Sequence, residues 1–147
     1  MRFRLIIDPE QEEEVVATVH DRSSLTDEIE ALVTAYAGTD KLPAFSDDGM
    51  KLLPFSQIEC ITVLDSKVIA IDRCGTHYRL KQRLYELEAV LPAFFIRINK
   101  SALANENRLE RFATAFNGAV DAVFKCGYRE YVSRRCFAAI KRRYDKL

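Results

Sequence analysis

Apolar and polar positions in the first twenty residues follow a pattern typical of extended strands. Residues 2–7 are rich in Phe, Leu and Ile, and the turn-forming pair Asp8-Pro9 follows them. Residues 13–20 alternate apolar and polar side chains, which favours a second strand, although a helix is also compatible with this stretch. The pattern therefore predicts a strand at residues 2–7 and favours another at residues 13–20.

A helix is predicted next, because apolar residues recur at helical spacing up to residue 36. Ser24 and Asp27 have the spacing of a capping box, in which each side chain accepts a hydrogen bond from the other residue's backbone N–H. Gly38 follows the last apolar residue, where glycine commonly ends a helix. Residues 1–40 are therefore expected to form a small β-β-α element. The apolar stripe of its helix comprises Leu25, Ile29, Leu32, Val33 and Tyr36.

The rest of the chain is predicted to be mainly β with short helices, an α+β fold. Short apolar runs alternate with turn residues, which favours sheets over helical bundles. A domain boundary is expected within residues 39–50, between the element at 1–40 and a domain at 45–147. Two hairpins are predicted: strands 58–64 and 68–72 around Asp65–Lys67, and strands 109–116 and 119–126 joined by Asn117-Gly118. The other expected elements are strands at 42–45, 77–80, 94–98 and 128–132, and helices at 81–90 and from Ser133 onward.

The charges divide unevenly along a chain whose net charge is zero. Residues 1–50 carry four Lys or Arg and twelve Asp or Glu, whereas residues 97–147 carry twelve Lys or Arg and five Asp or Glu. A basic segment interrupted by apolar residues is typical of a protein that binds a polyanion, most often nucleic acid. The acidic N-terminal part cannot share that partner, so two roles are expected in one chain.

The segment Arg97-Ile98-Asn99-Lys100-Ser101 presents polar side chains directly after a predicted apolar strand. Asn can pair bidentately with adenine, Lys and Arg can contact guanine or phosphate, and Ser can contact phosphate. This composition indicates a candidate nucleic-acid contact. The alternative is a polar loop that only solvates the strand end, with Asn99 as a turn residue.

The helix predicted from Ser133 has one apolar and one basic side. The basic side could contact phosphates, and the N-terminus of the helix offers free backbone N–H groups to an anion. The alternative is an ordinary solvated helix whose last turn is basic because the helix dipole favours cations there. The apolar side holds Cys136, Phe137, Ile140 and Tyr144, and the basic side holds Arg134, Arg135, Lys141 and Arg142.

Other classes of function find no support in the sequence. The four cysteines and two histidines have no metal-ligand spacing, so no metal site is expected and the cysteines are interpreted as reduced, small core residues. There is no P-loop or GxGxxG motif, and no nucleophile at diagnostic spacing from His20 or His77, so neither an enzyme nor a cofactor is expected. With no apolar run of membrane-spanning length and no signal peptide, the cytoplasm is the expected location.

Three motifs closely resemble the LytTR family of bacterial DNA-binding domains. They are FFIRINKSALAN at residues 94–105, Phe116-Asn117-Gly118, and Val132-Ser133-Arg134-Arg135. The family typically shows F-[IV]-R-[IVC]-H-[KR]-S-[YF]-[LI]-[VA]-N, then a hairpin, then [VA]-S-R-[RS]. The resemblance runs from about residue 45 to the end of the chain, and it makes DNA binding the expected function.

What the resemblance implies is an arrangement of short antiparallel sheets whose loops, rather than a recognition helix, enter the major grooves of duplex DNA. Transferred residue by residue, Asn99, Arg135 and Lys67 match positions that contact bases. The DNA backbone would be held by Arg97, Lys100, Ser101, Ser133 and Arg134, and by Arg142 on the basic side of the last helix.

The chain also departs from the family pattern. Asn99 stands where the family has histidine, and Ala102 replaces an aromatic residue, so base preference and local packing are expected to differ. Residues 1–50 are too few for a phosphoacceptor receiver domain, so the chain resembles stand-alone LytTR regulators. Such regulators are often encoded beside a small membrane protein that restrains them, and the element at 1–40 would then serve dimerisation or partner binding.

The expected function is therefore that of a bacterial transcriptional regulator, which binds double-stranded promoter DNA as a homodimer. The alternative is an interaction module that docks its basic C-terminal face on an acidic protein or a membrane surface.

Overall fold

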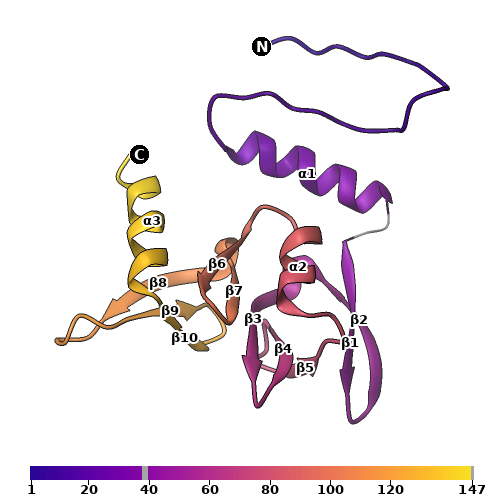
Figure 1. Ribbon diagram of the computed structural model, residues 1–147. Helices are drawn as coiled ribbons and strands as arrows, with labels where there is room; N and C mark the ends of the chain where they lie inside the picture. The colour runs from indigo at the N-terminus through magenta and orange to yellow at the C-terminus, as the bar shows by residue number, and fades with distance from the viewer. Residues whose placement is uncertain (38–39, 147) are drawn as a thin grey trace.

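The computed structural model describes residues 1–37 and 40–146, which form antiparallel β-strands and three helices (Figure 1). The mainly β fold predicted from the sequence is confirmed. The helices are α1 (Ser24–Ala37), α2 (Leu84–Val90) and α3 (Arg134–Tyr144). The strands are β1 (Lys41–Ser46), β2 (Gly49–Pro54), β3 (Ile58–Leu64), β4 (Lys67–Asp72), β5 (His77–Arg79), β6 (Phe95–Asn99), β7 (Ala102–Asn105), β8 (Leu109–Thr114), β9 (Val120–Phe124) and β10 (Arg129–Val132).

These strands form two antiparallel sheets. Seven strands pair in the order β2-β1-β5-β4-β3-β7-β6, and three pair in the order β10-β9-β8. The three-stranded sheet and α3 lie together at the β6 edge of the seven-stranded sheet (Figure 1). The seven-stranded sheet therefore meets the three-stranded sheet and α3 at edge strand β6.

The β3–β4 hairpin forms as the sequence predicts. Leu64 pairs with Lys67 across a two-residue turn, in which Asp65 and Ser66 have φ values of 49° and 64°. Positive φ at both central residues is typical of the type I′ turn, whose twist matches that of paired strands. The β8–β9 hairpin is confirmed as well, because Thr114 pairs with Val120 on either side of Asn117-Gly118.

Two strands were not predicted, β2 and β7. Each is identified by its pairing rather than by its own pattern, since β2 pairs along the whole of β1 and β7 lies between β3 and β6. All four residues of β7 are buried, so this strand shows no alternation of apolar and polar positions.

Two apolar clusters stabilise the fold. The first packs α2 against the seven-stranded sheet, and the second fills the space between β6, β7, the three-stranded sheet and α3. The largest fully buried members of the first cluster are Leu53, Ile58, Ile61, Leu87 and Leu103, and those of the second are Ile98, Phe124 and Val132. Because α3 contributes Ile140 to the second cluster, its orientation relative to β6 is set by packing.

A buried carboxylate also connects the two sheets. Glu59 on β3 is fully buried, and it forms an ion pair with Arg108 at the start of the β8–β10 region. The same carboxylate accepts a hydrogen bond from the backbone N–H of Cys126, between β9 and β10, at 2.9 Å. Removing one partner of such a pair leaves a buried charge uncompensated, so the pair fixes how the sheets dock.

The strands predicted at residues 2–7 and 13–20 are wrong. Residues 1–23 contain neither helix nor strand, and residues 1–25 are all exposed, including Phe3 at 91% and Ile7 at 85%. Alternation does not hold a strand by itself, because an isolated pair of strands with no second layer to bury its apolar face is marginal in water. The β-β-α element is therefore an extended segment followed by α1.

Helix α1 starts at Ser24 as predicted, but the Ser24–Asp27 capping box is wrong. The Thr26 hydroxyl donates to the carbonyl of Ser23 at 2.8 Å and accepts from the Ser23 backbone N–H at 3.0 Å. Asp27 instead forms an ion pair with Arg22 at 2.9 Å. Gly38, predicted to end the helix, lies outside the described residues.

Polar contacts attach α1 to the loop between α2 and β6. The Glu30 carboxylate accepts from the backbone N–H of Ala93 at 2.7 Å, and Arg22 donates to the Ala93 carbonyl at 2.9 Å. Arg22 also pairs with Glu106 at 3.0 Å. Among the described side chains of the apolar stripe, three remain exposed: Leu32 at 72%, and Leu25 and Val33 at 39% each.

The cysteines are all unpaired, but only some of them belong to the core. Cys60 on β3 is fully buried, and burial raises the pKa of its thiol well above the usual value. Cys126 and Cys136 are half-buried, whereas Cys74 is exposed. The interpretation of the cysteines as core residues is therefore wrong for Cys74.

Candidate nucleic-acid interface

Asn99 ends β6 and is almost entirely inside the protein, with 7% of its surface exposed. Its Oδ1 accepts from the backbone N–H of Ser101 at 2.7 Å, and its Nδ2 donates to the carbonyl of Tyr131 at 2.6 Å. The same Nδ2 lies 3.4 Å from the carboxylate of Glu130. The amide is thus occupied at both ends by the fold itself.

Lys100, the next residue, projects from the β6–β7 turn and is exposed. The Arg97 guanidinium stabilises this turn, because it donates a hydrogen bond to the Lys100 carbonyl at 2.9 Å, and it also forms an ion pair with Glu88. Of the cations in the segment 97–101, Lys100 is therefore the one that forms no ion pair with a residue that the structure describes.

The β3–β4 turn lies beside the β6–β7 turn. The backbone N–H of Val63, near the end of β3, donates to the carbonyl of Ser101 at 3.0 Å. Lys67 follows the β3–β4 turn and is exposed. One hydrogen bond between adjacent strands therefore relates the positions of Lys67 and Lys100.

Helix α3 starts next to the same turn. Ser133 caps it, since its hydroxyl accepts from the backbone N–H of Cys136 at 3.2 Å, which confirms the N-cap that the sequence predicts. The backbone N–H of Ser133 donates to the carbonyl of Ile98 at 2.9 Å, so the first turn of α3 is attached to β6. Arg134 and Arg135, in that first turn, are exposed.

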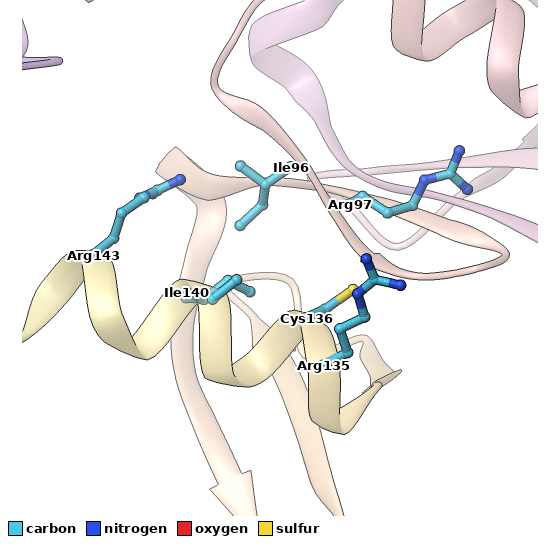
Figure 2. Close-up of a pocket in the computed structure, with 7 residues that line it drawn as sticks. Ile96, Arg97, Arg135, Cys136, Ile140 and Arg143 are labelled. Carbon is cyan, nitrogen blue, oxygen red and sulfur yellow. The ribbon is translucent and has the colours of Figure 1, made fainter.

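A groove of about 260 Å³ runs between β6 and α3. Ile96 of β6 faces Cys136 and Ile140 of α3 across it (Figure 2). The side chains of Arg97 and Arg135 extend from one end of this groove, and Arg143 lies toward the other (Figure 2). The apolar side predicted for α3 is confirmed at Cys136 and Ile140, and Arg134 and Arg142 are exposed as predicted. Arg135, however, lines the groove beside Cys136 instead of lying opposite it, and Tyr144 of the predicted apolar side is 45% exposed.

Several acidic residues of the basic C-terminal region have partners within the fold, whereas several exposed cations form no ion pair with a described residue. Three of the five acidic residues in 97–147 have partners within the fold: Glu106 pairs with Arg143 and Arg22, Asp121 pairs with Arg129, and Glu130 accepts hydrogen bonds. By contrast, Lys67, Lys100, Arg134, Arg135 and Arg142 are exposed and form no ion pair with any described residue. Exposed cations that no described acidic residue compensates favour a polyanionic ligand.

Residues 1–37 and 40–146 bring no group of three or more His, Cys, Asp or Glu together as metal ligands. Within the same described ranges, no helix has the length and apolar character needed to cross a membrane.

The LytTr DNA-binding domain family matches residues 48–145, which is most of the chain. The chain belongs to the LytTR family. The resemblance carried by residues 94–105 and by the Val132–Arg135 motif is therefore confirmed.

Relatives of this LytTR protein match over nearly the whole chain. An uncharacterized HTH-type transcriptional regulator of Staphylococcus aureus (strain bovine RF122 / ET3-1) is 31% identical over 146 residues, covering 97% of each chain. A second such regulator, from Staphylococcus aureus (strain MSSA476), is 30% identical with the same coverage. These relatives thus extend over the N-terminal region as well as the LytTR domain.

A solved structure has the same fold. The LytTr DNA-binding domain of a response regulator from Bacillus cereus superimposes with a TM-score of 0.63 and 22% sequence identity, and it covers 70% of this chain and 94% of its own. The arrangement of short antiparallel sheets that the LytTR resemblance implied is therefore confirmed.

The predicted contact residues of this LytTR domain fall into two groups. The exposed group is Lys67, Lys100, Arg134, Arg135 and Arg142. The residues of the second group make contacts within the fold. Arg97 donates a hydrogen bond to the β6–β7 turn, and Asn99 is buried. The carbonyl of half-buried Ser101 accepts a hydrogen bond from β3, and Ser133 caps α3. Contact of either group with DNA stays a prediction. Sequence reasoning missed Glu130: its partner Tyr128 is two residues away, but Thr62 and Asn99 reach it only through tertiary folding. The one signal in the sequence was an acidic residue in a basic region.

Proposed function

We propose that this LytTR protein is a transcriptional regulator that binds double-stranded promoter DNA through three neighbouring segments. The observation that carries the proposal is their common location: the β3–β4 turn, the β6–β7 turn and the N-terminal end of α3 are joined by backbone hydrogen bonds and all point to the lower side of Figure 1. Each segment contains at least one exposed cation that forms no ion pair with a described residue.

Base contacts are assigned to Lys67, Lys100 and Arg135, one from each segment. Lys and Arg reach the O6 and N7 acceptors of guanine in the major groove, and a contact from three separate segments would read successive parts of a site. Turns and a helix end, rather than a helix laid along the groove, would enter the DNA.

Contacts to the DNA backbone are assigned mainly to Arg134 and Arg142. Arg142 lies seven residues beyond Arg135, about 10 Å along the axis of α3, so it would contact phosphates that flank the bases read by Arg135. Phosphate contacts supply most of the affinity and make it dependent on salt. Arg97, Ser101 and Ser133 would support these contacts, since their side chains or backbone groups hold the turn and the helix cap.

Asn99 was predicted to contact a base, and the geometry argues for another role. To reach DNA, its amide would have to give up hydrogen bonds of 2.6 and 2.7 Å inside a nearly closed site. Leaving buried backbone groups without partners is costly. We therefore assign the base contact of this turn to Lys100.

Homodimerisation through residues 1–40 is part of the proposal. The extended N-terminal segment exposes large apolar side chains, with Leu5 at 71% and Val16 at 73%, and α1 exposes Leu32. Exposed apolar residues that gather in one region are typical of protein contact surfaces. A dimer would place two LytTR domains on repeated half-sites, and a small membrane protein that binds the same region would restrain it in the cytoplasm.

The test is direct binding of the purified full-length chain to duplex DNA. Fluorescence anisotropy would compare a fragment of its own promoter region with a scrambled duplex across a salt series. Selective binding to the promoter fragment, with affinity that falls steeply as salt rises, supports the proposal. Equal and weak binding to both duplexes and to anionic lipid vesicles would instead support an interaction module that uses the basic face.

A further inference from the structure

Glu130 on β10 is an acidic residue beside a surface that we propose to contact DNA, where a negative charge opposes binding. It is half-buried and receives three side-chain donors from different parts of the fold. Thr62 on β3 donates to Oε1 at 2.9 Å, Tyr128 donates to Oε2 at 2.6 Å, and Asn99 lies 3.4 Å from Oε1. The Glu130 carboxylate therefore has a structural role, which is to accept hydrogen bonds from these three side chains.

These donors join the two sheets. Thr62 belongs to the seven-stranded sheet and is 1% exposed, whereas Glu130 belongs to the three-stranded sheet. Burial, reinforced by the hydrogen bond to Glu130, raises the pKa of the Tyr128 phenol above its usual value, which favours the protonated form that donates this bond. The cluster is thus a satisfied polar network in a place where an unmet donor would be costly.

Asn99 extends the network to both proposed DNA-contacting elements. Its Oδ1 holds the backbone of Ser101 in the β6–β7 turn, and its Nδ2 holds the carbonyl of Tyr131 two residues before the cap of α3. Lys100 lies inside the first of these segments and Arg135 lies just beyond the second. One amide therefore relates the position of the turn to the position of the helix end.

We propose that Asn99 and Glu130 act as positioning residues, which set the spacing between Lys100 and Arg135 and thereby determine sequence selectivity without touching DNA. This inference rests on the proposed function. Contacts to bases require placement within a fraction of an ångström, and that placement depends on the residues that support the contacting ones. Contacts to phosphates tolerate looser placement, because they depend mainly on charge.

The experiment uses full-length protein and a duplex selected from a random-sequence library by the wild-type chain, with a scrambled version for comparison. Glu130→Ala should lower the ratio of selective to scrambled affinity about tenfold, the effect of losing one charge-assisted hydrogen bond. Binding to the scrambled duplex should be unchanged or tighter. Glu130→Gln, which keeps an acceptor for Asn99 and Thr62, should restore most of the ratio. The matched control is Glu110→Ala, which removes an exposed acidic residue on β8 and should leave the ratio unchanged.

Several results would overturn the inference. If the wild-type chain binds the selected and scrambled duplexes with a ratio of affinities near one, both the proposed function and the positioning role are contradicted. If the wild-type chain is selective and the Glu130→Ala variant is equally selective, only the positioning role is contradicted. Equal weakening of both duplexes by a Glu130→Ala variant that melts at the wild-type temperature would also overturn the inference, because selectivity would then not depend on Glu130.

Asn99→Ala gives an independent test, also in the event that Glu130→Ala does not fold. Each base pair of the selected duplex would be changed in turn. A positioning role predicts that Asn99→Ala reduces discrimination at the base pairs read by both Lys100 and Arg135. Loss confined to a single base pair, still present in the Lys100→Ala background, would show that Asn99 reads that base directly and would overturn the inference.

Discussion

Arg135→Ala offers the sharpest test of the proposed DNA contact, because the structure separates binding from stability at this residue. Arg135 is exposed in the first turn of α3 and pairs with no described acidic residue. The cap of the helix comes from Ser133, and alanine is a good helix former. The variant should therefore fold with the stability of the wild type.

The expected loss of affinity follows from the type of contact. A guanidinium that pairs bidentately with guanine contributes about 1–3 kcal/mol of discrimination against the wrong base. This corresponds to a loss of about 5-fold to about 140-fold on the selected duplex. On scrambled DNA only one charge is lost, so binding there should weaken much less.

Arg142→Ala is the matched control, since it removes the same side chain from the same helix two turns away. As a phosphate contact, Arg142 should weaken binding to selected and scrambled duplexes about equally and lower the salt slope by about 1. Fluorescence anisotropy across a salt series would measure both quantities, with thermal melting to verify folding. If Arg135→Ala behaves like Arg142→Ala, weakening both duplexes equally, Arg135 holds only phosphate and the assignment of base reading to α3 is refuted.

The remaining predictions concern the fold. Arg108→Ala should lower the free energy of unfolding, measured by urea denaturation, by about 3 kcal/mol, because it leaves the buried Glu59 carboxylate without its cationic partner, although Arg108 itself is partly exposed. A loss below about 1 kcal/mol would contradict the role given to the pair. Ser133→Ala should cost about 0.5–2 kcal/mol through loss of the α3 cap, and an unchanged urea midpoint would exclude the cap. Burial raises the pKa of the Cys60 thiol in the folded chain, so the unfolded chain loses this proton first as pH rises. Stability should therefore fall above about pH 8.5, and the fall should be shallower in Cys60→Ala; identical pH profiles would refute the linkage. Removal of residues 1–40 should leave a folded domain that binds DNA with a lower tendency to dimerise, and aggregation of the shortened chain would place the domain boundary elsewhere.

Features with short-range causes could be predicted from the sequence. The β3–β4 and β8–β9 hairpins and the Ser133 cap depend on residues a few positions apart, and the structure confirms all three. The exposure of Arg134, Lys141 and Arg142 on α3 follows from helical spacing alone. The strands at residues 2–7 and 13–20 also had a local signal, but a strand needs a partner with a buried face, and residues 1–37 and 40–146 supply none for these two segments.

The arrangement of the candidate site required the tertiary structure. By itself, the sequence determined the family, the mainly β fold and a set of cations that suit a polyanion. It did not distinguish Asn99 from Lys100, which are neighbours of similar polarity, because one is buried by contacts with residues about thirty positions away and the other is not. Which polar groups face the solvent and which support their neighbours depends on long-range pairing between strands, and local sequence carries no record of that pairing.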